Sequence, residues 1–212
     1  HLIIINKKAS EIVQGDKTGD MPLSEKVKNY IKQRDDKPGN VFCGVVHRLD
    51  RPVSGIVIFA KTSKALSRMN ELFRDKTIQK TYWAVVKNKP PKISDRLTHY
   101  LIKNEKTNTS KAFATERPGA LKAELSYTLI ASISNYHLLE INLYTGRHHQ
   151  IRAQLSAIGC PIKGDLKYGF DRSNPDGGIH LHARKLVFIH PVSKEPLSIT
   201  APVPDDVIWK AI

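Results

Sequence analysis

The side chains best suited to chemistry lie between Gly44 and Thr62, in the sequence GVVHRLDRPVSGIVIFAKT. The polar centre of this stretch holds one carboxylate, Asp50, between Arg48 and Arg51. Because nearby cations favour the ionised form of a carboxyl group, we expect Asp50 to be an anion. Taken alone, the same residues also fit an ordinary surface loop with an Arg–Asp ion pair.

A second dense group occupies residues 145–154, TGRHHQIRAQ. A glycine followed by the start of a helix offers free backbone N–H groups and the positive end of the helix dipole to an anion. This pattern predicts that a phosphate or a carboxylate is held here. The side chains placed to hold it are Arg147, His148, His149 and Arg152.

One arginine of this group needs a partner within the protein. Arg152 follows Ile151, which the helical pattern places facing inward, so the stem of Arg152 should lie on the helix flank. A half-buried guanidinium requires a carboxylate to offset its desolvation. Asp50 is a candidate for this partner.

Other common kinds of active site fit less well. His148 and His149 are adjacent, so their side chains should diverge on a helix, whereas His180 and His182 are two apart on one face of a strand. Neither pair has an acidic or cysteine partner at a recognisable metal-binding spacing, so we expect no metal site. The sequence contains no G-x-S-x-G elbow and no phosphate-binding loop.

The elements that must position these groups mix helices with mostly antiparallel strands. This mixture predicts an α+β fold with a mixed sheet flanked by helices and loops, formed by residues 1–212 as a single domain. The only break that resembles a domain boundary is 88–91, and the strands after it should form an antiparallel meander. Predicted helices cover 23–33, a segment capped by Ser63, 148–158 and 204–212; predicted strands cover 1–5, 45–46, 56–60, 77–87, 96–103, 110–115, 122–131, 137–144, 180–189 and 197–201; predicted loops cover 16–20, 34–40, 103–111 and 164–178.

The amino-acid composition indicates which class of binding partner and which cellular location to expect. Thirty-four Lys and Arg against 20 Asp and Glu give a net charge of +14, spread along the chain, which favours a polyanion partner. No apolar run approaches the roughly 20 residues that span a bilayer, and no basic amphipathic helix suggests a membrane surface. Two cysteines, Cys43 and Cys160, form no C-x-x-C motif and no disulfide framework, which favours a cytoplasmic location.

Four blocks of the sequence resemble the signatures of the RluA-type pseudouridine synthases. They follow the family's order across residues 44–191, and the first strand with Asn6-Lys7 matches the family's opening. Four blocks in order are far more specific than any one of them. The blocks are HRLDRPVSGIVIFAKT, KTYWAVV, TGRHHQIRAQLSAIGCPIKGDLKYG and LHARKLVFIHP.

The resemblance implies the pseudouridine synthase fold and the isomerisation of uridine to pseudouridine within RNA, with no metal or organic cofactor. The base is detached from C1′, rotated and rejoined through C5. The family's essential aspartate corresponds to Asp50, its active-site tyrosine to Tyr82, and its aspartate-paired arginine to Arg152. An anionic Asp50 suits a nucleophile or a group that stabilises charge at C1′. Tyr82 can stack on a flipped uracil and help to move the C5 proton.

The resemblance also implies contacts with the substrate. Arg48 corresponds to the residue that enters the space left by the flipped base. Arg147 and His149 are expected to contact phosphate or sugar, and Leu181 to pack on the base edge or on the catalytic loop. The expected partner is rRNA or tRNA, bound by a monomer that needs no other protein.

The sequence departs from the family pattern in three places. Asn6-Lys7-Lys8 lacks the usual Pro and Gly after the first lysine, and His148 stands where Thr is common. No S4-like module precedes the catalytic domain, so the basic surface should supply much of the RNA affinity. The alternative is a catalytically silent RNA-binding chaperone on the same fold, which could lose the aspartate freely.

Overall fold

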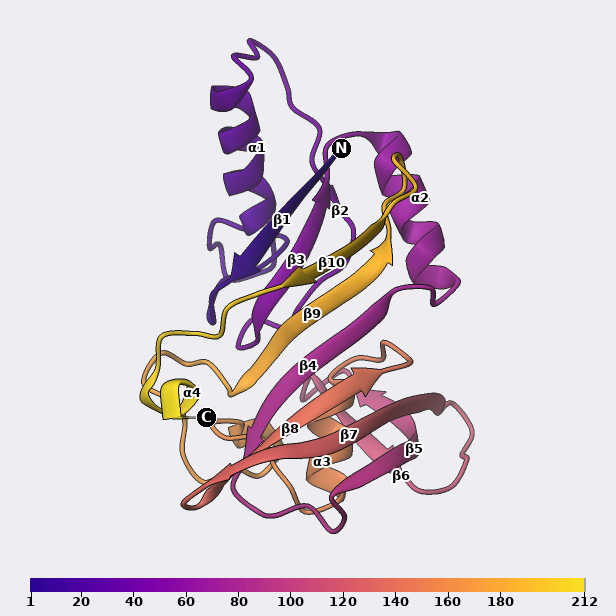
Figure 1. The fold of residues 1–212 in the computed structure, drawn as a ribbon, viewed down its shortest axis with the longest axis vertical. Helices are drawn as coiled ribbons and strands as arrows, with labels where there is room; N and C mark the ends of the chain where they lie inside the picture. The colour runs from indigo at the N-terminus through magenta and orange to yellow at the C-terminus, as the bar shows by residue number, and fades with distance from the viewer. Residues whose placement is uncertain (212) are drawn as a thin grey trace.

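The protein is built on one mixed sheet of ten strands, described by a computed structural model over residues 1–211. The strands follow the order β1-β3-β9-β4-β8-β7-β5-β6, with β2 paired to β3 and β10 paired to β9. Within the described residues only β3 and β9 run parallel, and the other strand pairs are antiparallel. The predicted α+β class with a mostly antiparallel mixed sheet is confirmed (Figure 1).

Helices interrupt this sheet at four points along the chain. In Figure 1, α1 and α2 flank the half that holds both β1 and β3, and α3 lies behind the half formed by β5 to β8. Among the described residues, no helix is long and apolar enough to cross a membrane. The elements are β1 (Leu2–Lys7), α1 (Leu23–Arg34), β2 (Gly44–Val45), β3 (Ser54–Ala60), α2 (Ser63–Arg74), β4 (Gln79–Val86), β5 (Ser94–Asn104), β6 (Thr109–Phe113), β7 (Leu121–Ile133), β8 (Tyr136–Leu143), α3 (Gln150–Ala157), a 3₁₀ turn (Leu166–Tyr168), β9 (Leu181–Ile189), β10 (Pro196–Thr200) and α4 (Val207–Ala211).

Strand β3 is buried on both faces because a helix covers each of them. Ile56 and Ile58 pack with Met69 of α2, while Val57 and Phe59 point to the other face and pack with α1. All seven residues of β3 are buried. A continuous apolar strand is what such two-sided burial requires. The strand is therefore a rigid support for the loop 46–53 that precedes it.

Gly55 allows β3 and β9 to approach each other. Its φ is +114°, and a Cβ on this residue would lie 2.4 Å from the carbonyl oxygen of Ala183. Only glycine tolerates both the backbone conformation and the contact. The parallel pairing of Ser54 with His182 and of Gly55 with Ala183 therefore brings loop 46–53 beside the start of β9.

The other half of the sheet supports α3. Leu125 of β7 and both Leu139 and Ile141 of β8 are fully buried, and they share one apolar cluster with Ile151 and Leu155 of α3. Their burial fixes which face of α3 turns inward. The residue after Ile151 is thereby held at the border between this core and loop 46–53.

The strands after residue 94 do not form the predicted simple meander. β7 pairs with β5 and not with β6, so β6 forms the edge of the sheet. The burial of the two strands explains this order. β7 contributes Ala123, Leu125 and Tyr127 to the core, whereas Ser110 is the only buried residue of β6. The strand with more apolar surface takes the interior position.

Three predicted helix starts are wrong, although the helices themselves are confirmed. The last helix, α4, begins at Val207 and not at residue 204, and its predicted end at residue 212 lies outside the described residues. Thr62, not Ser63, caps α2, because its hydroxyl accepts the Ala65 N–H at 3.1 Å. α3 begins at Gln150, two residues later than predicted, because His149 has the left-handed backbone conformation with φ +50°. A left-handed residue cannot belong to the helix that follows it.

Candidate active site

The Asp50 loop is a short turn fixed at both ends. The Val53 N–H donates to the Asp50 carbonyl at 3.0 Å, which closes the turn. Upstream, Nε2 of His47 accepts the backbone N–H of Ile58 at 3.2 Å, and the His47 ring stacks on Phe73. Burial lowers the pKa of His47 to about 4, so the ring is neutral and can accept this hydrogen bond. His47 therefore anchors the loop to β3.

Lys7 ties the end of β1 to the same loop. Its side chain is 1% exposed, and its Nζ donates to the carbonyl oxygens of Lys8 (2.9 Å) and Arg51 (3.0 Å). Burial lowers its pKa to about 8, against the opposing charges of Glu11 and Asp50. The sequence after Lys7 departs from the family pattern, so a role for this turn was in doubt. In the structure the Lys7 ammonium binds the carbonyl of Arg51, the residue next to Asp50.

The loop 145–149 is organised by the side chain of Gln150. Its Oε1 accepts hydrogen bonds from the Thr145 hydroxyl (2.8 Å) and the Arg147 N–H (3.0 Å), and its Nε2 donates to the Glu124 carbonyl (3.1 Å). The Arg147 N–H is therefore already satisfied. It is not one of the free N–H groups expected for an anion at this glycine, and the prediction that an anion binds here stays a prediction.

Arg152 lies between two carboxylates. Its Nε and Nη2 donate to Asp165 at 2.7 and 2.9 Å, and its Nη1 donates to Asp50 Oδ2 at 3.1 Å. The side chains of Arg152 and Asp165 are 4% and 1% exposed, whereas that of Asp50 is 32% exposed. Burial opposes the charge of Arg152, but the bonds and charges of Asp165 and Asp50 outweigh it and raise its pKa. The expected Asp50–Arg152 pair is present.

Sequence reasoning missed Asp165. The sequence did contain a hint, because Asp165 is the acidic residue of the family block GDLKYG and has no other evident ion partner there. A two-bonded Arg–carboxylate contact holds the guanidinium plane in one orientation. The ring of Tyr168 adds to this restraint, since the Arg152 guanidinium carbon lies 4.9 Å from its centroid.

His149 touches Asp50 from the other side. Its Nε2 lies 3.5 Å from Asp50 Oδ2, and its Nδ1 lies 2.9 Å from the Tyr168 hydroxyl, which accepts the Ser110 N–H at 2.7 Å. Burial lowers the pKa of His149 to about 3, although the Asp50 charge opposes the shift. The neutral ring has one N–H. If the Tyr168 hydroxyl donates its proton to Nδ1, then the single N–H of the ring is on Nε2, where it faces Asp50.

The two adjacent histidines do not diverge as predicted. The left-handed backbone of His149 brings the rings into a stack with centroids 3.8 Å apart. His148 is half-buried, and its Nδ1 lies 2.9 Å from the Ser110 hydroxyl. No group of three or more metal-ligating side chains is found within residues 1–211.

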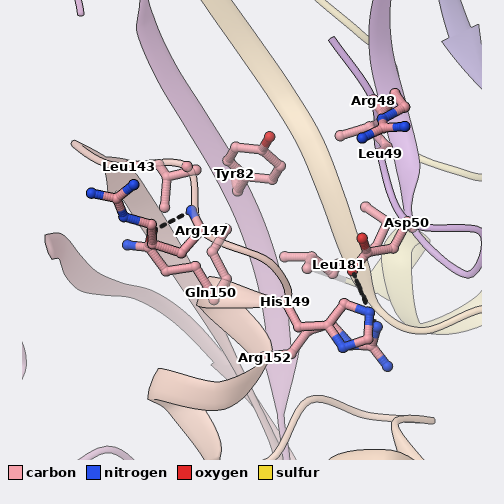
Figure 2. A pocket seen from close by; sticks show the side chains of 13 residues that line it. Arg48, Leu49, Asp50, Tyr82, Leu143, Arg147, His149, Gln150, Arg152 and Leu181 are labelled. Atoms are coloured by element: carbon pink, nitrogen blue, oxygen red, sulfur yellow. Dashed lines mark hydrogen bonds and ion pairs between the residues drawn. The ribbon is translucent and has the colours of Figure 1, made fainter. Parts of the chain in front are cut away.

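A pocket of about 530 Å³ opens above these residues, and Asp50 and Arg152 lie at its wall. Figure 2 shows Tyr82 and Leu181 on the strands beside Asp50, with Arg147 across the opening. Burial, and then the Asp50 charge, raises the pKa of Tyr82, so the phenol is protonated at neutral pH. The seven residues to which the family resemblance gives a role line this one pocket, whereas His148 does not: Arg48, Asp50, Tyr82, Arg147, His149, Arg152 and Leu181.

The arginines near Asp50 have different surroundings. Arg48 is exposed, and its Nη1 lies 3.5 Å from Oε1 of Gln14. Arg147 is also exposed, and its Nε donates to the Lys122 carbonyl at 3.0 Å. Arg51 forms a surface ion pair with Asp20.

Known proteins share this arrangement of sequence and fold. Residues 1–157 match the family model described as RNA pseudouridylate synthase. The chain is 32% identical over 209 residues to the ribosomal large subunit pseudouridine synthase C of Vibrio cholerae, covering 96% of this chain and 63% of the relative. It is 31% identical over 219 residues to the tRNA pseudouridine synthase C of Pectobacterium carotovorum, covering 95% of this chain and 56% of the relative.

Solved structures agree on the fold. Human RNA pseudouridylate synthase domain containing 4 superposes with a TM-score of 0.81 at 22% identity, covering 98% of this chain and 87% of that chain. Human RNA pseudouridylate synthase domain containing 1 gives a TM-score of 0.74 at 21% identity, covering 96% and 80%. The chain spans less than two thirds of the length of the two bacterial relatives named above. On the match of residues 1–157, the chain belongs to the RNA pseudouridylate synthase family.

Proposed function

We propose that this protein isomerises specific uridines in structured rRNA or tRNA to pseudouridine. The observation that carries the proposal is the state of Asp50 in its pocket. Both contacts of its carboxylate, with Arg152 and with His149, go to Oδ2, and within residues 1–211 Oδ1 has no hydrogen-bond partner. One oxygen is held and the other is available to a nucleotide. The names of the relatives, for a large ribosomal subunit and for tRNA, support the two RNA classes.

Asp50 acts on the ribose or the base of a flipped uridine. The Arg152 guanidinium binds Oδ2 and orients the carboxylate, so the group needs no reorganisation when the reaction begins. An ion held in this way can attack carbon as a nucleophile or stabilise positive charge at C1′. The product has the same atoms and the same oxidation state as the substrate, so the chemistry requires no oxidant, reductant or transferred group.

Tyr82 and Leu181 provide the walls for the uracil. Both line the pocket, and the Tyr82 ring offers a face on which a base can stack. Because its pKa is raised, Tyr82 remains a phenol at neutral pH. Its oxygen can receive the C5 proton only if its own proton leaves in the same step, so we assign it a relay role and not that of a pre-formed base.

The cationic residues at the rim hold the rest of the nucleotide. Arg48 has little to fix it within the protein, which suits a side chain that enters the RNA stack when the base leaves. Arg147 faces the pocket from the opposite side and is placed for a phosphate. His149 was expected to contact phosphate or sugar, but its buried ring and its contact with Asp50 favour a role in holding that carboxylate.

A silent RNA chaperone is less favoured than an enzyme. Such a protein needs the basic surface but has no use for Asp50, Tyr82 and Arg152 around one pocket. We further propose that the protein acts as a monomer. We assign it to the cytoplasm, which agrees with two cysteines that are both free.

The test is pseudouridine mapping of total RNA from cells that lack this protein and are then given back either the wild-type chain or Asp50→Asn. We expect one or more rRNA or tRNA sites to lose pseudouridine and to regain it with wild type only. A tritium-release assay on uridine-labelled transcripts of the identified RNA measures the same reaction in vitro. If Asp50→Asn restores the modification, the role assigned to Asp50 is wrong. If no site changes and no tritium is released, the proposed enzyme activity is wrong.

A further inference from the structure

Two hollows adjoin the catalytic pocket, and neither has been assigned a role above. The first, of about 820 Å³, shares Leu143 with the pocket. The second, of about 1170 Å³, shares Asp50, His149 and Arg152 with it. An RNA chain that places one nucleotide in the catalytic pocket must pass over adjacent surface on each side. The first hollow, named the lysine hollow here, is lined by Lys76, Ile78, Gln79, Lys80, Asn142, Leu143 and Tyr144.

The charges of the two hollows differ. The lysine hollow contains two cations, Lys76 and Lys80, and no acidic residue. The second hollow is mixed, since it places Asp16, Asp50 and Asp165 among its three basic side chains. A phosphodiester is repelled by carboxylates and attracted by ammonium groups, so the lysine hollow is the better match for an RNA backbone.

Lys80 is the central residue of this match. Its side chain is half-buried at the start of β4, and within residues 1–211 it has no hydrogen-bond or ion-pair partner. Burial lowers its pKa, and the charge of Lys76 adds to the shift. A Cβ on Gly146 would lie 3.9 Å from its Nζ, so the ammonium lies beside the loop that carries Arg147. An ammonium withdrawn from water without a counter-ion is stabilised when an anion binds.

Tyr144 supplies an aromatic surface next to these lysines. It is 41% exposed, yet its hydroxyl lies 2.9 Å from the Ser126 hydroxyl and the Arg96 guanidinium carbon lies 4.9 Å from its ring centroid. The ring is therefore held in place before any ligand binds. Fixed aromatic rings beside cations are the usual means of binding single-stranded RNA, because every base has a face that can stack.

We propose that the lysine hollow binds the nucleotide next to the isomerised uridine, with Lys80 at its phosphodiester and Tyr144 against its base. This inference rests on the proposed function, because it takes the uridine in the catalytic pocket as its reference point. The hollow and the pocket meet at Leu143, and Lys80 lies beside Gly146, which lines the pocket. A single strand can thus pass from one to the other without leaving the cationic surface.

The test compares Lys80→Gln with Lys80→Arg and with the matched control Lys89→Gln. Lys89 is exposed beyond the opposite end of β4 and lines neither hollow. Binding of a fluorescent single-stranded oligouridylate is measured by anisotropy over a range of salt concentrations. For Lys80→Gln we expect the Kd to rise about three- to tenfold, and the slope of log K against log salt to lose about 0.7, as for one phosphate contact on a single strand.

The controls separate this inference from the proposed function. Lys80→Arg should keep the wild-type slope because it keeps the charge, and Lys89→Gln should keep both the slope and the Kd. Equal behaviour of Lys80→Gln and Lys89→Gln, with both proteins melting at the wild-type temperature, would overturn the assignment of Lys80. Absence of isomerisation by the wild-type chain would instead overturn the proposed function, and the binding result would stand.

The aromatic part of the proposal has its own variant pair. Tyr144→Leu should weaken oligouridylate binding about fivefold or more by removing the stacking surface. Tyr144→Phe should bind within about twofold of wild type, because it keeps the ring and loses only the hydroxyl. If Tyr144→Leu binds as tightly as Tyr144→Phe, no base stacks on this residue.

Discussion

The guanidinium of Arg152 has a closed side and an open side. On the closed side, Asp165 accepts two hydrogen bonds and is 1% exposed; on the open side, Asp50 accepts one and its side chain is 32% exposed. Identical functional groups thus meet different surroundings within one cluster. Both carboxylate oxygens of Asp165 accept hydrogen bonds from Arg152, whereas Asp50 contacts the protein only through Oδ2 within the described residues. The first carboxylate therefore serves structure and leaves the second free for chemistry.

The largest effect should follow from Asp50→Asn. The amide keeps the shape of the side chain but removes the negative charge, so we expect tritium release to fall at least about 1,000-fold. Chemical denaturation should show little loss of stability, because the open side is partly solvated. A large loss of stability with residual isomerisation would reverse the roles assigned to the two carboxylates.

Asp165→Asn should have the opposite balance. Removing one partner of a buried ion pair leaves a desolvated charge, which typically costs about 3–5 kcal/mol. We expect that loss in the free energy of unfolding, measured by urea denaturation, with a smaller loss of activity in the molecules that remain folded. Equal unfolding free energies for Asp165→Asn and Asp50→Asn would show that the two sides of Arg152 do not differ as described.

Tyr168→Phe tests the contact of Asp50 with His149, whose ring Tyr168 holds from the other side. Loss of the hydroxyl removes the partner of His149 Nδ1, and contacts of this indirect kind are worth about 10- to 100-fold in other sites. We expect kcat to fall about tenfold with KM unchanged. Nitrogen NMR should show the Nε2–H tautomer in wild type and a mixture in the variant. A single unchanged tautomer would exclude the positioning role of Tyr168, whatever happens to kcat.

Lys7 adds a pH dependence to the support of the loop. Its pKa is about 8 in the folded protein and 10.5 in the unfolded reference, so between these values the unfolded chain binds more protons. Stability should therefore rise with pH across this window, by at most about 1.4 kcal/mol per pH unit. The difference between wild type and Lys7→Met, measured by urea denaturation from pH 7 to 11, should show this slope. Below pH 8 this stability difference should not change with pH.

The smallest effect should come from Arg51→Gln. Arg51 pairs with Asp20 at the surface, where both side chains are about half-exposed, 43% and 53%. Ion pairs of this kind contribute little because solvent screens them. Thermal melting and tritium release should match wild type. A clear loss of activity would move Arg51 from the surface to the substrate-binding group.

The sequence pointed more directly to the residues proposed to act on the ligand than to the residues that hold them in place. Asp50, Tyr82 and Arg152 belong to dense motifs, and the structure gathers all three around one pocket. The buried position of Lys7 could not be predicted, because a lysine at a strand end usually lies in solvent. The stacking of His148 on His149 depends on one left-handed residue, which no apolar spacing reveals. Likewise, the edge position of β6 depends on how much apolar surface each strand buries.

Gly55 has a consequence for the assembly of the pocket. The Asp50 loop leads into β3, while Leu181 begins β9, so the pairing of these two strands keeps Asp50 and Leu181 at one pocket. The spacing of the two strands is limited by the contact of Gly55 with the Ala183 carbonyl, where even a methyl group would force the strands apart. The absence of a side chain at Gly55 thus determines how closely β3 and β9 can approach each other. Gly55 lies outside the pocket, yet the loop and the strand that it allows to approach both contribute to the pocket wall.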